Sequence, residues 1–288
     1  MKTMIHFLCG FFLLTSLTAQ AKNKFFTANA LLTPKLNVQP KATTKLLYFG
    51  GPVISEVKVV PVYWSSRVKP AIQNAMDDFY TSYVNSKHMD WLTEYNTNLT
   101  AVDGRAGTNQ TIHRGTSIAP ILMTPNLTAK QVTDEQVQNE IEKQIDSGVL
   151  PKPDSNTLYM IHFPQDMQIT IEGMQSCFSF GGYHNGAKNA KYGDLFYSVL
   201  PDCAFALDDA ASLSSTTFVA AHELIEAVTD AYPTPGSSPA YPQAWNANDG
   251  SEIADLCQNG GSTLVGAKAS YNISLEWSNS RGLCYNGQ

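Results

Sequence analysis

Residues 221–230 read Ala-His-Glu-Leu-Ile-Glu-Ala-Val-Thr-Asp, and this stretch decides how the chain is interpreted. His222 and Glu226 are four residues apart, so on a helix both side chains point to one side, and Asp230 continues that line. An apolar stripe runs beside this polar one, formed by Phe218, Ala221, Ile225 and Val228. We therefore expect a helix that its apolar stripe seats in the core, with a polar stripe next to it.

The polar stripe has the pattern H-E-x-x-E, a variant of the zinc-binding H-E-x-x-H in which the second ligand is a carboxylate. His222 and Glu226, one helical turn apart, can hold one ion, while Glu223 leans toward the water bound to that ion. Coordination lowers the pKa of this water, and a nearby carboxylate can take its proton during attack on a carbonyl. The motif predicts a metal-dependent hydrolase of peptides or proteins with Glu223 as general base.

The third ligand of such a site is expected downstream, because catalytic zinc usually has three protein ligands and one open position. Glu252 and Asp255 are two acids three residues apart on a predicted helical turn. We assign Glu252 as a metal ligand and Asp255 as the residue that orients a histidine ligand, and the two roles can be exchanged.

The identity of the ion follows from the same residues. One histidine with two carboxylates is a more anionic set than the common two-histidine site, so Mn²⁺ and Ca²⁺ are alternatives to Zn²⁺. A structural, carboxylate-rich site with no open position is the alternative to a catalytic one.

Of the other histidines, His184 is the one that we assign to the site. It lies in a turn rich in glycine and aromatic residues, where it can stabilise a developing oxyanion or supply a metal ligand from another element. Its alternative role is a hydrogen bond within a hairpin. His162, at the end of a predicted strand, is expected in the core or at its rim. No G-x-S-x-G pattern is present, so a serine nucleophile is not predicted.

The remaining segments alternate between strand and helix patterns. Valine-rich residues 57–64 and residues 157–163 predict buried strands, and residues 169–200 predict hairpins. Helical spacing begins at Pro70, and Thr133 with Gln136 forms a capping box for a helix that ends near Gly148. Three further predictions are a cap at Ser214 or Ser215 for the motif helix, its end near Tyr232, and a hairpin over 267–285. These elements predict an α+β, zincin-like single domain over residues 48–288, with a mixed sheet, an active-site helix and a C-terminal hairpin.

The N-terminal region has the features of an export signal. A short basic start is followed by an apolar run from Met4 to Leu17 and by Ala19-Gln20-Ala21, which predicts a signal peptide over residues 1–21. Residues 22–47 mix Lys, Thr, Asn, Gln and Pro without periodicity and predict a flexible leader. The protein is therefore expected to be secreted or periplasmic.

Four cysteines follow the predicted signal peptide, and an even number in an oxidising compartment favours two disulfides. Three pairings are possible. Proximity in sequence favours Cys177 with Cys203 and Cys257 with Cys284. A cysteine metal site is disfavoured because no C-x-x-C pair is present.

Composition excludes two classes of partner. The net charge is −6 and charged residues make up only 15% of the chain, so neither a nucleic-acid footprint nor a polybasic membrane patch is expected. No later apolar stretch is long enough for a stable membrane anchor. A peptide or protein substrate is the expected partner, and the sequence does not indicate the oligomeric state.

Several segments resemble the Exordium/phosphate-induced protein family. They are Tyr48-Phe49-Gly50-Gly51-Pro52-Val53 before a strand ending at Trp64, residues 148–159, Cys177, Gly182-Tyr183-His184, Cys203 and Thr229-Asp230. The likeness covers about residues 48–285, and the chain is similar to a microbial branch that carries His222, Glu223 and Glu226. Plant members are secreted and associated with growth and brassinosteroid response. The resemblance thus implies a second possibility, a non-catalytic extracellular binding or signalling protein with a structural metal site.

Overall fold

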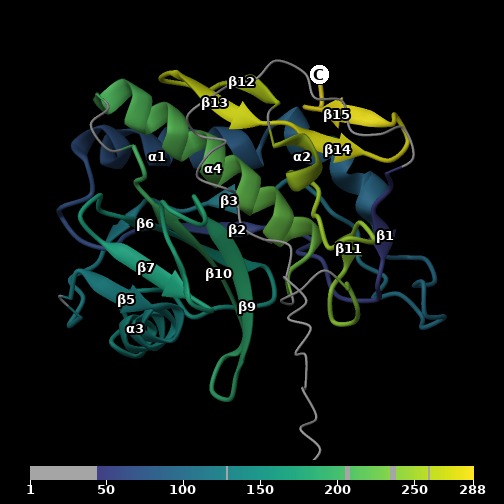
Figure 1. Ribbon diagram of the computed structural model, residues 1–288, viewed down its shortest axis with the longest axis horizontal. Helices are drawn as coiled ribbons and strands as arrows, with labels where there is room; N and C mark the ends of the chain where they lie inside the picture. Colours follow the sequence, from purple (N-terminus) through teal and green to yellow (C-terminus); the bar gives the residue numbers. More distant parts are fainter. Residues whose placement is uncertain (1–43, 128, 205–207, 234–237, 259) are drawn as a thin grey trace, which may run out of the picture.

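A mixed sheet of six strands forms the centre of the fold (Figure 1). The computed structural model describes residues 44–127, 129–204, 208–233, 238–258 and 260–288, so the predicted signal peptide and the leader up to residue 43 lie outside the described residues. The strand order is β3-β2-β6-β10-β9, with β4 also paired to β2; all neighbours are parallel except β9, which runs antiparallel at the edge. The strands are β2 (Lys58–Tyr63), β3 (Thr116–Ser117), β4 (Ile121–Leu122), β6 (Thr157–Phe163), β9 (Tyr183–Asn189) and β10 (Gly193–Pro201).

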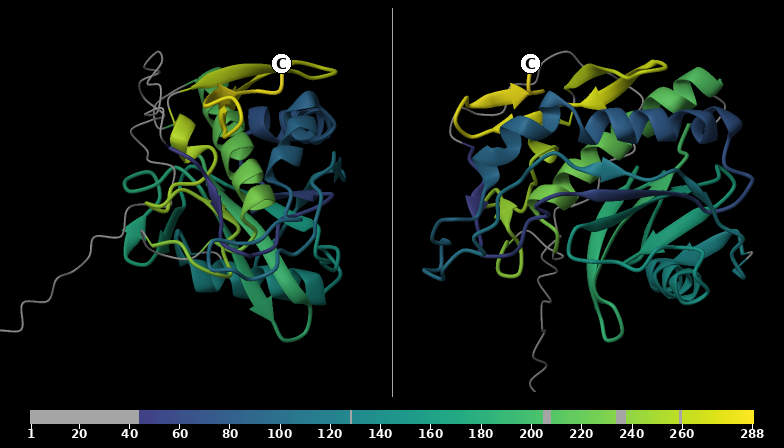
Figure 2. Two further views of the ribbon diagram at one scale, coloured as in Figure 1. Left: turned by 90° about the vertical axis from the view of Figure 1, so that its right-hand side faces the viewer. Right: turned by 180° about the vertical axis from the view of Figure 1, so that it is seen from behind.

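Helices cover both faces of this sheet, which explains the nearly continuous apolar sequence of its central strands. Alternate residues of β2, β6 and β10 belong to two separate cores. One core lies under α1 (Pro70–Val84) and α4 (Asp209–Thr229), and the other lies under α3 (Asp134–Asp146). Figure 2 shows α1 and α4 on one side of the sheet with α3 on the opposite side. The predicted α+β class and mixed sheet are confirmed.

The smaller elements pack around these layers. α3 begins at the predicted capping box, in which Thr133 and Gln136 bond each other's backbone amides. A small sheet beside α3 contains β5 (Gln131–Thr133), β7 (Gln168–Ile171) and β8 (Met174–Gln175). α2 (Lys87–Asp90) and a 3₁₀ helix (Trp91–Tyr95) follow α1.

The C-terminal segment forms two hairpins where the sequence predicts one. The first pairs β12 (Gly261–Val265) with β13 (Ser270–Ser274), and the second pairs β14 (Glu276–Ser278) with β15 (Leu283–Tyr285). β13 packs on α4, and the hydroxyl of Thr217 donates to the carbonyl of Asn272 at 2.7 Å. α4 therefore lies between the sheet and these hairpins (Figure 1).

The predicted start of α4 was wrong by one to two turns. The N-cap is Asp208, whose Oδ1 accepts from the amide of Ala211 at 2.8 Å, and not Ser214 or Ser215. A carboxylate is as good a cap as a hydroxyl. Inside the helix, Ser212 donates to Asp202 at 2.9 Å. The helix also ends at Thr229, before the predicted Tyr232.

The last residues of the predicted leader are part of the folded body. Leu46 is buried, and β1 (Leu47–Tyr48) pairs with β11 (Trp245–Asn246). The apolar side chain of Leu46 and the pairing of β1 offset the polar composition that precedes them, which explains why composition alone placed the boundary too late.

Both favoured cysteine pairs are disulfides in the structure, Cys177 with Cys203 and Cys257 with Cys284. They are the bonds expected of a chain that folds in an oxidising compartment. Within the described part of the chain, no helix is both long and apolar enough to cross a membrane.

Candidate metal centre

The second half of α4 carries the polar residues of the motif into the interior of the protein. Because α4 is covered by the sheet on one side and by the hairpins on the other, His222, Glu223 and Glu226 are each at most 1% exposed. The helical spacing brings His222 Nε2 to 3.1 Å from Glu226 Oε1, as the sequence predicts. The polar stripe is thus buried together with the apolar one.

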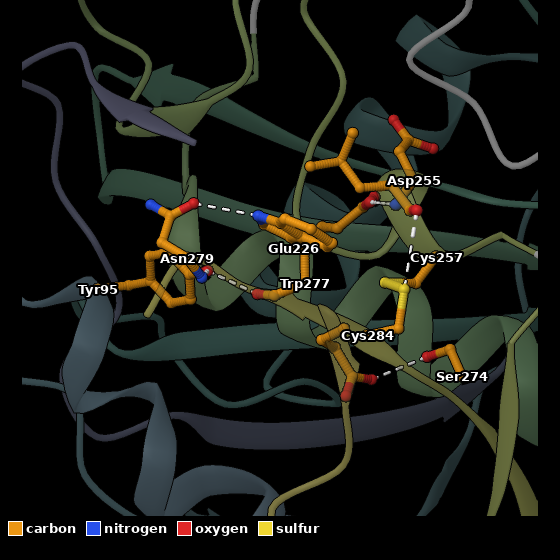
Figure 3. Close-up of a disulfide and its surroundings, with 10 residues drawn as sticks. Tyr95, Glu226, Asp255, Cys257, Ser274, Trp277, Asn279 and Cys284 are labelled. Atoms are coloured by element: carbon orange, nitrogen blue, oxygen red, sulfur yellow. Dashed lines mark hydrogen bonds between the residues drawn. A yellow bond between two sulfur atoms is a disulfide. The ribbon is translucent and has the colours of Figure 1, made fainter. Parts of the chain in front are cut away.

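The downstream acids reach this helix from the segment before the 3₁₀ helix Asp255–Cys257. Asp255 Oδ1 lies 3.7 Å from His222 Nε2, and the amide of Asp255 donates to Glu226 Oε1 at 3.1 Å (Figure 3). The disulfide between Cys257 and Cys284 anchors this segment to β15. The sequence indicates an orienting role for Asp255. In the structure Asp255 is the acid that lies against His222.

Glu252 and His184 meet on the other side of Glu226. His184 Nε2 is 3.5 Å from Glu252 Oε1, and its Nδ1 is 3.6 Å from Glu223 Oε2 and 3.9 Å from Glu226 Oε2. Strand register explains this position, because His184 is paired with Ser198, which lies on the α4 face of β10 between Phe196 and Leu200. The structure therefore brings all of the predicted catalytic and ligand residues together.

A glycine allows the start of β9 to approach α4 so closely. A Cβ atom at Gly182 would lie 2.5 Å from Cγ1 of Val219 and 3.0 Å from Oε1 of Glu223. Such distances are shorter than van der Waals contact, so a larger residue would force Val219, Glu223 or the strand itself to shift. Gly182 is a positioning residue that the sequence indicated only as part of a glycine-rich turn.

Asp230 does not join the cluster, although the helical pattern places it in line with His222 and Glu226. It is the C-cap of α4 with φ −147°, so its side chain leaves the helical direction. Its carboxylate accepts from the amide of Ala244 at 2.7 Å and from Nδ2 of Asn246 at 2.6 Å. Asp230 therefore holds the β11 segment against the end of the helix.

The donor set fits a divalent cation. Two groups of three side chains each have ligand atoms within 4.8 Å of one another: His222, Glu226 and Asp255, and His184, Glu226 and Glu252. Imidazole and carboxylate groups of this kind bind Zn²⁺ and Mn²⁺, and a carboxylate-rich set also suits Ca²⁺. These residues could hold a metal ion, and the donor types alone do not select among the three.

The electrostatics of the cluster show the effect of burying several carboxylates side by side. Burial raises the pKa of Glu223 well above its usual range, against the opposing charge of His222. Burial likewise raises the pKa of Glu226 to about 7, with Asp255 adding to the shift and His222 opposing it. Burial alone would lower the pKa of His222, but the charges of Glu226 and Asp255 raise it well above its usual value. A cation bound among these carboxylates would stabilise their ionised forms.

Two other histidines lie outside the cluster. His162 is buried as predicted, and its Nε2 lies 2.9 Å from the hydroxyl of Tyr80. His88 is also buried, and it stacks on Tyr83 with ring centroids 5.4 Å apart. Neither residue has the carboxylate neighbours that surround His184 and His222.

The chain matches no family model, no curated protein and no solved structure. The resemblance to the Exordium/phosphate-induced protein family therefore stays a prediction. Any functional conclusion rests on the geometry of the centre itself.

Proposed function

We propose that this protein is a secreted or periplasmic metal-dependent hydrolase, most simply a zinc peptidase with a zincin-like helix. The support is the buried donor set around α4 and the H-E-x-x-E spacing on that helix. The two disulfides support folding in an oxidising compartment. A bound divalent ion would polarise a substrate carbonyl and make water more acidic.

The observation that carries the proposal is the carboxylate of Glu223. It is 1% exposed, and neither oxygen makes a conventional hydrogen bond within the described residues. Burying a carboxylate without conventional hydrogen bonds is costly. Groups that weaken a fold in this way are characteristic of functional sites.

Glu223 is suited to moving a proton. Burial raises its pKa well above the usual range of a glutamate, so its carboxylate takes up a proton more readily than an exposed one. In the proposed reaction it takes a proton from the attacking water and gives it to the leaving amine, while the histidines and the other carboxylates around α4 would hold the metal. His184 Nε2 already donates to the carbonyl of Asp230 at 3.0 Å, which favours a ligand role for His184 over an oxyanion role.

A second function is favoured by the burial of the same residues. His222 and Glu223 are at most 1% exposed, so a substrate needs a local opening to reach them. A structural ion in a non-catalytic extracellular binding protein, as the Exordium resemblance implies, needs no such opening. The two functions therefore differ in whether Glu223 has a role.

Hydrolysis of a mixed fluorogenic peptide library, measured beside metal content, tests the proposal. We expect Glu223→Gln to keep its metal and to lose about 10²–10⁴-fold in rate, because only the base is removed. His222→Ala should lose both metal and activity. Glu135→Gln, a matched change at an exposed glutamate of α3, should lose neither.

Two outcomes contradict the hydrolase. If the metal-loaded wild type cleaves no peptide in the library, the non-catalytic function takes its place. If Glu223→Gln cleaves as fast as the wild type, Glu223 is not the general base.

A further inference from the structure

The two carboxylate oxygens of Glu226 face different histidines. Oε1 lies 3.1 Å from Nε2 of His222, whereas Oε2 lies 3.9 Å from Nδ1 of His184. A carboxylate that binds a single ion needs to face only one of these two histidines. Glu226 is also the only residue common to the two groups of three ligands found in the described chain.

Each of the two groups is large enough for its own ion. Ligand atoms in each group lie within 4.8 Å of one another. Bonds of about 2.0–2.1 Å from zinc to nitrogen or oxygen place neighbouring ligand atoms about 3.3 Å apart. Small movements of the side chains would therefore bring the ligand atoms of each group to bonding distance from one ion. The groups receive different acids, Asp255 beside His222 and Glu252 beside His184.

Charge balance also favours more than one ion. Glu223, Glu226, Glu252 and Asp255 bring four carboxylates together, each within 4 Å of His184 or His222. When all four are ionised, one divalent ion compensates two of the negative charges, while two ions balance all four. Uncompensated charge in a protein interior is strongly destabilising.

The hydrogen bond of His184 determines where its lone pair points. A backbone carbonyl can only accept, so the contact of Nε2 with the carbonyl of Asp230 at 3.0 Å requires a proton on Nε2. The neutral ring then carries its lone pair on Nδ1, which faces Glu223 and Glu226 at 3.6 and 3.9 Å. Glu252 lies 3.5 Å from Nε2, so its carboxylate has to turn toward Nδ1 to share an ion with it. A lone pair and two ionised carboxylates repel one another unless a cation or a proton lies between them. A backbone carbonyl that fixes one nitrogen while the other binds metal is a recurrent arrangement.

We propose that the centre binds two divalent cations that share Glu226. His222, Glu226 and Asp255 hold one ion, and His184, Glu226 and Glu252 hold the other. Paired ions of this kind occur in hydrolases about 3.5–4 Å apart. This inference deepens the proposed function, but its test counts ions and does not depend on hydrolysis.

The experiment is a titration of metal-free, full-length mature protein with Mn²⁺, followed by calorimetry and by electron paramagnetic resonance. We expect two equivalents in the wild type and in the control Glu135→Gln. His184→Ala and Asp255→Asn should each bind one equivalent, because each removes a ligand from a different ion. Glu226→Gln should weaken the binding of both ions.

The resonance spectrum gives a readout that a merely structural role would not change. Two Mn²⁺ ions bridged by one carboxylate are magnetically coupled, so the second equivalent should replace the isolated-ion signal by a coupled one. In His184→Ala the isolated-ion signal should persist at saturation. Circular dichroism and a second variant, His184→Gln, separate loss of an ion from loss of the fold.

One equivalent in the wild type, lost equally in His184→Ala and Asp255→Asn, would overturn the two-ion centre in favour of a single ion. That result would leave the hydrolase intact if the library is still cleaved. Conversely, two equivalents without cleavage would support the two-ion centre and reject the hydrolase. No binding at all would reject both.

Discussion

Buried carboxylates lie on both faces of the central sheet, and the two faces stabilise them differently. On the α3 face, Oδ1 of Asp134 accepts from the hydroxyls of Tyr183 and Tyr197 at 2.6 and 2.7 Å. On the α4 face, Glu223 and Glu226 meet histidines and other carboxylates. Neutral donors surround Asp134, whereas Glu223 and Glu226 lie in a cluster with an excess of carboxylates.

The difference teaches that burial of an acid does not by itself indicate a metal site. Asp134 lies in the first turn of α3, where the helix dipole favours negative charge, and nearby hydroxyl and amide groups satisfy its oxygens. Glu223 and Glu226 lie in the second half of α4, where no free backbone amides of the helix are available. A proton or a bound cation can balance them.

The largest expected effect comes from metal removal. Saturating metal at about 1,000 times its dissociation constant should stabilise the folded protein by about 4 kcal/mol, because the ion binds only the assembled cluster. For a chain of this size that corresponds to a rise in Tm of roughly 10 °C, measured by calorimetry with and without chelator. Asp134→Asn should show the same rise, since its carboxylate has no part in binding. An unchanged wild-type Tm on chelation would remove the contrast between the two faces.

Removing the disulfides separately should sharpen the comparison. Changing both Cys257 and Cys284 to Ser, or both Cys177 and Cys203, should each cost about 3 kcal/mol of unfolding free energy, given the similar loops that they close. Only the first change should also weaken metal binding, because it frees the segment that carries Asp255. Equal metal affinity in the two variants, measured by calorimetry, would show that this anchor is not needed by the centre.

Asp134→Asn tests the face that uses neutral donors. Loss of the charge at the accepting oxygen should cost about 2 kcal/mol in urea unfolding, because hydrogen bonds from two tyrosines to a charged acceptor are weakened together. Tyr197→Phe should cost about 1 kcal/mol, since Tyr183 still donates. A cost near zero for Asp134→Asn would mean that its burial is not stabilised by these donors.

His88 provides the smallest effect and a case with neither donors nor ion. Both of its ring nitrogens lack a hydrogen bond within the described residues, and burial lowers its pKa to about 4. The unfolded chain, with a pKa near 6.5, therefore binds the proton first as pH falls. Stability should be fully present above pH 6.5 and fall as pH drops toward 4.

The variant His88→Phe isolates this contribution, because a phenyl ring can keep the stacking on Tyr83. Between pH 6 and pH 5 the wild type should lose about 1 kcal/mol more than the variant, as measured by urea unfolding at each pH. Parallel pH profiles would mean that His88 is protonated within the fold.

Local signals in the sequence predicted the elements that depend on neighbouring residues. The capping box at Thr133 begins α3, and the valine-rich run around β2 is a buried strand, as expected. The cap of α4 was misplaced because several hydroxyl and acid side chains precede the motif, and the sequence does not show which of them have tertiary partners. Ser212 is one that does, through Asp202.

The sequence by itself determined the pairing of His222 with Glu226, because the period of an α-helix fixes which side chains share one side. Only the tertiary structure decided which further residues meet them. Asp255 lies beside His222 and Glu252 beside His184 because the segment around Cys257 is anchored by its disulfide and because Gly182 lets β9 approach α4. Such contacts depend on strand register and close packing between segments distant in sequence, which no local pattern specifies.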